Sequence, residues 1–362
     1  MRRMRSDDGA AAILIAILLP LVLLGFGALV IDAGSLYSER RQLQNGADAA
    51  TLALAQVCAS GSCTNSSGQS PLTQASGYAD RNSKDGASYV DVNLICGTAP
   101  GLTACATTPP GLPAGAKYVS VTTQTGTSAG ASLMPAILGK VIDSSYNGKT
   151  VAATAIAAYG APAGLTSGLP VTISLCEWNA YTANGTVFGT PKYTSKMEHI
   201  LYLHDTTGAA GCKAGPAGSD LPGGFGWLLT KTSACTAYSD VNSEFPDDPG
   251  VSIDNACKDE LDKLVNTTVN IPIFGSVSGT GANIKYTMTG FAAFYLTGWG
   301  LPGTFHDSTI PGTKCFQGGK LGLSSSSKYL CGVFTTPLEP ADGVIGGGAG
   351  LPGGVTVFQL IG

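Results

Sequence analysis

The sequence is poor in the residues on which most enzymes and nucleic-acid-binding proteins depend. Only 12% of its 362 residues are charged, and it contains three histidines. Its basic residues form no cluster larger than Arg2, Arg3 and Arg5, and the formal net charge is -4. A nucleic-acid-binding surface needs a concentrated positive patch, so we expect no nucleic acid among the partners.

The motifs of common catalytic sites are also absent. The chain has no G-x-S-x-G nucleophile elbow and no H-E-x-x-H zinc motif. His199 and His204 are five residues apart on an expected strand, which places them on opposite faces, and His306 is expected in a loop. We therefore expect no enzymatic activity and no cofactor, and a membrane-tethered hydrolase is the least favoured function.

Two segments match a ligand-binding pattern only in part. "GAGLPG" at 348–353 fits G-x-G-x-x-G, but "VTVFQLIG" after it indicates a turn into a strand, whereas a phosphate-binding loop opens a helix. "SDVNSEFPDD" at 239–248 offers oxygen ligands for calcium, but Phe245 stands where a calcium loop of the EF-hand type needs Gly. We expect a turn and a solvated acidic loop, and no metal site.

Cysteine is present, but without the C-x-x-C spacing of zinc ribbons and thioredoxin-like redox sites. All ten cysteines follow the long apolar run near the N-terminus, which indicates an oxidising compartment and structural disulfides. Nearness in sequence favours four pairs and leaves a fifth. These pairs are Cys58 with Cys63, Cys96 with Cys105, Cys212 with Cys235, Cys315 with Cys331, and finally Cys176 with Cys257.

The apolar run covers residues 9–31 and contains 23 uncharged residues. As a helix it would be about 35 Å long, enough to cross a hydrocarbon core of roughly 30 Å. A cleavable secretory signal has a shorter apolar region followed by an A-x-A site, and neither is found here. We expect a transmembrane helix in which Pro20 is tolerated as a kink.

The orientation of this helix follows from the residues on its two sides. Arg2, Arg3 and Arg5 precede it, against Arg40 and Arg41 after it, which is a weak asymmetry. The cysteines decide the question, because all ten lie beyond the span. We expect a single-pass protein of the cell membrane, with a cytoplasmic N-terminus and an extracytoplasmic chain from about residue 33 onward.

A helical pattern continues after the span. Leu36, Leu43, Ala47, Ala50, Leu54 and Val57 follow one another at steps of 7, 4, 3, 4 and 3 residues and form one face. An unbroken helix over residues 10–57 would be about 72 Å long. This face either packs on the chain's own domain or docks on partner subunits, and its six residues are the candidate docking face.

The same residues carry a family resemblance. The segment "GAAAILIAILLPLVLLGFGALVIDAGSLYSERRQLQNGADAATLALA" resembles the N-terminal domain of TadG-like Flp (Tad) pilus-assembly proteins, above all in "RRQLQNGADAATLALA". The resemblance implies a bacterial membrane protein with membrane lipid and other Tad pilus-assembly proteins as partners, and it is compatible with a homo-oligomer. Gly46 stands where the motif usually has Ala, and Leu14 stands where filament-forming pilins carry Glu.

The resemblance also raises the question of cleavage. "MRRMRSDDG" is similar to a prepilin leader, which would be cut between Gly9 and Ala10. A filament subunit buries its new N-terminal amine, and a buried amine needs a carboxylate nearby, which Leu14 cannot provide. We expect an uncleaved anchor.

The rest of the chain predicts an α+β protein. We expect a basic cytoplasmic start at 1–8, the transmembrane helix at 9–31, a helix continuation with a pseudopilin-like module at 32–160, a linker at 161–169 and a β-rich, disulfide-stapled exported domain at 170–362. The module would hold strands at 116–125 and 149–159 and a short helix at 131–142. The exported domain reads as β-sandwich-like, with one clear helix at 255–265. The favoured function is a structural or scaffolding pseudopilin-like subunit; the alternative is a cell-surface binding protein or adhesin.

Overall fold

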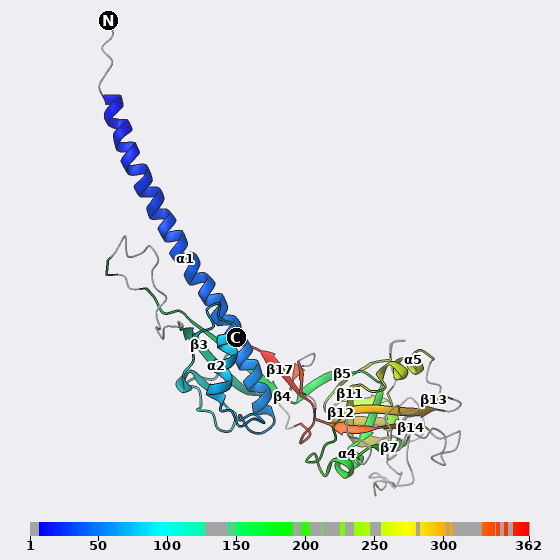
Figure 1. The fold of residues 1–362 in the computed structure, drawn as a ribbon. Helices are drawn as coiled ribbons and strands as arrows, with labels where there is room; N and C mark the ends of the chain where they lie inside the picture. The colour runs from blue at the N-terminus through cyan, green and yellow to red at the C-terminus, as the bar shows by residue number, and fades with distance from the viewer. Residues whose placement is uncertain are drawn as a thin grey trace. The chain divides into compact units, whose positions relative to one another are not determined.

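The computed structural model has the α+β fold that the sequence predicts (Figure 1). It describes residues 7–126, 144–145, 148–190, 197–202, 212, 225–228, 235–246, 255–279, 283–301, 304–306, 328–336, 338–340, 344–346 and 350–361. Two compact units divide the chain. The first unit holds Met1–Gly111, Lys117–Ala158 and Leu360–Gly362, and the second holds Leu112–Ala116 and Tyr159–Gln359.

Helix α1, Asp7–Ala59, is a single helix of 53 residues. At 1.5 Å per residue it is about 80 Å long. Pro20 lies inside it and leaves it unbroken, so the predicted continuous helix is confirmed. Figure 1 shows its N-terminal half projecting from the rest of the first unit.

The C-terminal half of α1 packs against α2, Pro71–Arg81, and against strand β3, Lys117–Thr125. Helix α2 was not predicted from the sequence. Its start is nevertheless encoded locally, because the Ser70 side chain accepts a hydrogen bond from the Thr73 N–H and Pro71 occupies the first turn. Such a cap and proline are an ordinary helix-start signal.

The first unit contains a small sheet. β3 lies between β1, Ser88–Tyr89, and β4, Ala152–Gly160, and also pairs with β2, Ile95–Gly97, which follows the short 3-10 helix η1, Val92–Leu94. The two strands predicted for the module are therefore confirmed, whereas the predicted helix at 131–142 lies outside the described residues. The end of the chain returns to this unit, where the Ile361 N–H donates to the Ile156 carbonyl at 2.9 Å.

The second unit is built on an eight-stranded sheet. Its order is β7 (His199–Tyr202), β14 (Tyr329–Thr335), β12 (Lys285–Leu301), β11 (Thr268–Ser278), β6 (Val171–Ser174) and β8 (Phe225–Trp227), with β10 (Glu244–Pro246) and β13 (Thr304–His306) also paired to β12. β11 and β6 run parallel, and the other pairs are antiparallel. His306 therefore ends a strand and does not lie in the predicted loop.

A three-stranded sheet completes this unit, with β5, Pro162–Ser167, between β16, Val344–Ile345, and β9, Ala237–Asp240. β15, Leu338–Pro340, runs parallel to β17, Thr356–Leu360, and both belong to the six-stranded sheet that also holds β1, β2, β3 and β4. The prediction of a linker at 161–169 is wrong, because most of that segment is strand β5. Its Gly and Pro residues suggested a joint, but pairing with distant segments satisfies its backbone. Glycine suits position 164 of this strand, because the Cβ of any other residue would lie 2.3 Å from the Tyr238 hydroxyl.

Helices cover the main core of the second unit. Trp178 of α4, Leu175–Thr182, and Leu261 of α5, Asn255–Leu264, are buried in one cluster with side chains of β6, β7, β11, β12 and β14. We predicted a β-sandwich-like domain, in which a second sheet would cover this core, but helices α4 and α5 cover it. β6 ends at Ser174, because the Ser174 side chain accepts a hydrogen bond from the Cys176 N–H and so caps α4. The predicted helix at α5 is confirmed.

Disulfides connect elements in both units. Cys58–Cys63 and Cys96–Cys105 pair as predicted, with Cα–Cα distances of 4.1 and 5.0 Å. The predicted pairs Cys212–Cys235 and Cys176–Cys257 are wrong, because the structure joins Cys176 to Cys212 and Cys235 to Cys257 at Cα–Cα distances of 5.7 and 5.1 Å. Cys331 is disulfide-bonded, and its predicted partner Cys315 lies outside the described residues.

Nearness in sequence does not separate the two possible partners of Cys235, because Cys257 is 22 residues away and Cys212 is 23 residues away. The fold decides, and both Cys212 and Cys235 find their partner on a helix. Cys176 lies on α4 and Cys257 lies on α5. Each of these two bridges therefore fastens a core helix of the second unit.

Candidate functional site

The N-terminal half of α1 is exposed and apolar. Its most apolar 18-residue window has a mean hydropathy of 2.9, and 0% of that window is buried. Its exposed large side chains include Ile13, Leu14, Ile15, Ile17, Leu18, Leu19, Val22, Leu23, Phe26, Val30 and Ile31. Each such side chain gains about 1.5–3 kcal/mol on leaving water. The helix is long and apolar enough to cross a membrane.

The face of α1 beyond Asp32 behaves differently from the predicted docking face. Leu43, Ala47, Ala50 and Leu54 are at most 2% exposed, and they lie in the core of the first unit. They cannot dock on a partner without opening that core, so this interpretation is wrong for these four residues. The remaining two, Leu36 and Val57, are half-buried.

Hydrogen bonds fasten this buried face to the sheet. The Thr123 hydroxyl of β3 donates to the Leu43 carbonyl at 2.8 Å, and the Thr51 hydroxyl donates to the Ala155 carbonyl of β4 at 3.3 Å. The small side chains at Ala47 and Ala50 permit the close approach. The C-terminal half of α1 is therefore an integral part of the first unit.

Gly46, the departure from the family pattern, lies where α1 meets α2. A Cβ at this position would stand 3.2 Å from the Ala79 Cα and 3.3 Å from its carbonyl oxygen. These distances are tighter than ordinary contact, so glycine permits the observed approach of the two helices.

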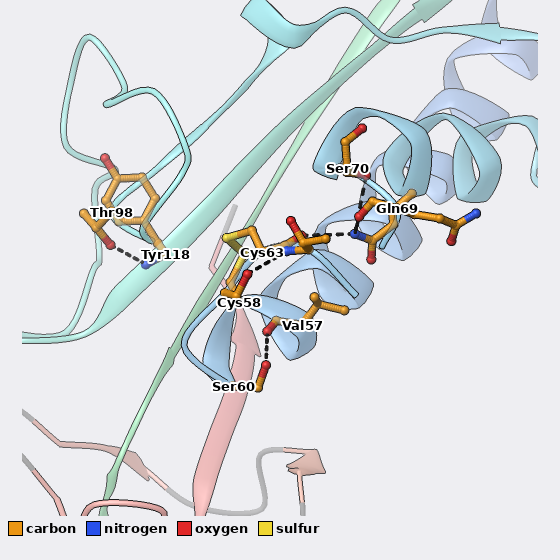
Figure 2. Close-up of a disulfide and its surroundings, with 11 residues drawn as sticks. Val57, Cys58, Ser60, Cys63, Gln69, Ser70, Thr98 and Tyr118 are labelled. Carbon is orange, nitrogen blue, oxygen red and sulfur yellow. Dashed lines mark hydrogen bonds between the residues drawn. A yellow bond between two sulfur atoms is a disulfide. The ribbon is translucent and has the colours of Figure 1, made fainter. Parts of the chain in front are cut away.

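A disulfide lies at the C-terminal end of α1. Figure 2 shows the Cys58–Cys63 bridge beside the start of α2, where Gln69 and Ser70 are labelled.

A pocket of about 470 Å³ lies where α1 enters the first unit. α1 contributes Ser35, Ser38, Glu39 and Gln42, the turn between α2 and β1 contributes Lys84 and Asp85, and Gly126 follows β3. The Gln42 Oε1 accepts a hydrogen bond from the Lys84 N–H at 2.6 Å, which fixes the turn on the helix. The residues that line this pocket thus include two serines, a lysine and two acidic residues, so it can hold a ligand with polar groups.

Glu39 is the buried charged group of this pocket, at 9% exposure. Burial, followed by the nearby charge of Asp85, raises the pKa of the Glu39 carboxyl above 4.5, and a hydrogen bond with the Thr125 side chain acts in the opposite direction. The sequence analysis did not single out this residue. A signal existed, because Glu39 lies three residues after Leu36 and four before Leu43, on the buried face of the helix.

Replacing Glu39 by Gln should therefore stabilise the first unit at pH 7. The Glu39 carboxyl has a higher pKa in the folded protein than in the unfolded chain, so the folded protein binds this proton more tightly. The carboxyl therefore does not destabilise the fold below the unfolded pKa, and its destabilising effect grows as the pH rises toward the folded pKa. Hydrogen exchange of residues 71–125 in urea would measure the difference. We expect Glu39→Gln and wild type to be equal near pH 3.5 and the variant to be more stable at pH 7.

The matched control is Glu260→Gln, which removes an exposed carboxylate paired with Lys263 at 3.1 Å. An exposed pair contributes about 0–1 kcal/mol, so this variant should change little at either pH. Equal stability of Glu39→Gln and wild type at pH 7 would contradict the effect of burial.

The other predicted site residues are not brought together. Gly9 and Ala10 lie in the first turns of α1. His199 stacks on the Tyr181 ring at 4.0 Å, and His204 lies outside the described residues. In the acidic segment Glu244 pairs with Lys285 at 3.2 Å, while Asp247 and Asp248 lie outside the described residues. In the part of the chain that the structure describes, no group of three His, Cys, Asp or Glu side chains could hold a metal ion.

Comparison with known proteins finds one family. Residues 9–56 match the family model described as putative Flp pilus-assembly TadE/G-like. Comparisons with curated proteins and with solved structures give no match. The matched residues are the exposed apolar half of α1 together with most of its buried half, and they support involvement in Flp pilus assembly. At its N-terminus the chain is thus similar to the TadE/G-like domain of Flp pilus-assembly proteins.

Proposed function

We propose that the protein is a membrane-anchored, non-enzymatic component of Flp (Tad) pilus assembly, with a TadG-like, structural and pseudopilin-like role. The observation that carries this proposal is the match over residues 9–56, which coincides with a helix whose first half is exposed and apolar. The partners would be the surrounding lipids and other Tad pilus-assembly proteins. Self-association of the protein is compatible with this role.

The structure supports a mechanical role for α1. The same helix that would span the membrane continues, without a break, into the core of the first unit. The hydrogen bonds of Thr51 and Thr123 hold that continuation against the sheet. A force on the first unit would therefore act directly on the anchor, as an assembly scaffold requires.

The proposed topology can be tested together with the redox state. Protease added to intact spheroplasts should digest the chain beyond about residue 33, because that part would face the outside. Nine cysteines are disulfide-bonded among the described residues, so a maleimide reagent should label them only after reduction. Protection from protease, combined with labelling before reduction, would contradict the exported orientation.

The proposed role predicts a loss of pili. Deleting the gene should strongly reduce Flp pili seen by electron microscopy, and the wild-type gene should restore them. A variant lacking residues 12–31 should fail to restore them, because it lacks the anchor. Normal piliation together with ligand binding by the full chain would point to the adhesin instead. A mature chain starting at Ala10 and recovered as a main component of sheared pili would contradict the uncleaved anchor.

A further inference from the structure

The pocket at the entry of α1 has no role in the function proposed so far, yet its chemistry is selective. Glu39 and Asp85 can accept hydrogen bonds from an ammonium group, while the Lys84 ammonium group and the Ser38 hydroxyl can donate to a phosphate. The Ser35 hydroxyl already donates to the Asp32 carbonyl at 2.8 Å. Counting these side chains, the pocket carries one positive and two negative formal charges. Such a set suits a zwitterion whose cationic end is a primary amine.

The position of the pocket along α1 limits what can reach it. Ser35 is four residues beyond Ile31, which places it about 6 Å past the end of the apolar run. The layer of headgroups on each side of a hydrocarbon core is roughly 5–8 Å thick. The pocket would therefore begin at headgroup depth with Ser35 and reach outward to Glu39, which is eight residues and about 12 Å past Ile31.

From this position and chemistry we propose that the pocket binds the phosphoethanolamine headgroup of a membrane lipid. The inference rests on the membrane anchoring proposed above. The ammonium group lies between Glu39 and Asp85, and the phosphate lies toward Lys84 and the Ser38 hydroxyl of α1. A bound headgroup ties the first unit to the membrane surface and fixes the depth of the helix.

The buried carboxylate favours a primary amine over a quaternary one. Glu39 is 9% exposed, and a buried carboxylate is best satisfied by a cation that also donates hydrogen bonds. A primary ammonium has three N–H donors, whereas the choline group has none. The pocket should therefore distinguish phosphoethanolamine from phosphocholine, although both headgroups carry the same net charge.

Binding to the full-length protein in a non-ionic detergent can be measured by calorimetry with soluble headgroups. Glycerophosphoethanolamine should bind, and glycerophosphocholine should bind at least about tenfold more weakly because it loses the charged hydrogen bonds. Ethanolamine alone should also be about tenfold weaker because it cannot reach Lys84 through a phosphate. Glu39→Gln should weaken glycerophosphoethanolamine about tenfold, while Glu260→Gln should leave it unchanged.

A second measurement separates a lipid from other sources of an amine. Native mass spectrometry of the protein released from nanodiscs of equal phosphatidylethanolamine and phosphatidylcholine should show retained phosphatidylethanolamine on wild type and not on Glu39→Gln. N-acetyl-lysinamide binding as tightly as glycerophosphoethanolamine would instead identify a lysine of a partner protein and overturn the proposal. Equal binding of the two glycerophospho compounds would overturn it as well.

These outcomes are independent of the piliation and protease experiments. The soluble headgroups reach the pocket whether or not α1 spans a membrane, so their failure to bind speaks against the site alone. A chain that binds them but fails the protease experiment would contradict the anchoring.

Discussion

Trp178→Ala should lower the free energy of unfolding of the second unit by about 3–5 kcal/mol, the usual effect of truncating a fully buried Trp. Trp178 is 0% exposed and lies in the main core cluster. Its ring meets Phe334 edge-on at 5.0 Å and Phe188 at 5.6 Å, and Phe334 in turn contacts Phe294 at 5.2 Å. The substitution would open a cavity between α4 and the sheet, where no neighbouring element can fill it.

The measurement is urea unfolding of the full chain, followed by hydrogen exchange in β11 and β12. Trp178→Phe should be much milder, because it keeps an aromatic ring and removes an indole N–H that meets no acceptor among the residues described. Val187→Ala is the surface control, since Val187 is 46% exposed. A loss below about 1 kcal/mol for Trp178→Ala would mean that α4 is not part of the core.

The sequence predicted best where one periodic pattern decides the structure. The apolar run and the face that follows it have helical spacing over more than 40 residues, so α1 could be predicted as one continuous helix. Strand β3 could also be predicted, because it is rich in β-branched residues. Such patterns are local, and no distant segment is needed to create them.

The features that the sequence did not predict correctly have a common physical cause. Each depends on contacts with distant parts of the chain. β5 contains Gly and Pro and looks like a linker, but β9 and β16 supply its hydrogen-bonding partners. The docking face of α1 looked available because the sequence does not show that α2 and β3 cover it. Glu39 was missed because its position on the buried face matters only once Asp85 approaches it in space.

The short helices were missed for a different reason. α2 and α4 have 11 and 8 residues, so their periodic pattern is brief and easily taken for a loop or strand. Their starts are nevertheless marked by Ser70 and Ser174, each of which caps its helix. Reading serine caps before assigning strands would have found both.

Replacing Cys176 and Cys212 together by Ser should destabilise the second unit by about 3–4 kcal/mol, since the bridge closes a loop of 36 residues in sequence. A closed loop restricts the unfolded chain, and this restriction grows slowly with loop length. The Cys58–Cys63 bridge spans only 5 residues, so the same double replacement there should cost less, about 2 kcal/mol.

Urea unfolding of the oxidised full chain, followed by hydrogen exchange in each unit, compares the two bridges directly. The Cys176/Cys212 variant should lose protection in β6, β11 and β12, because Cys176 lies on α4, which packs on that sheet. The Cys58/Cys63 variant should lose protection in α2 instead, where the Gln74 amide donates to the Cys63 carbonyl at 3.0 Å. Treating wild type with a reductant should reproduce both losses at once, since each variant mimics one reduced bridge. If the shorter bridge proved the more stabilising, restriction of the unfolded chain would not be the source of its effect, and native contacts at the end of α1 would have to account for it.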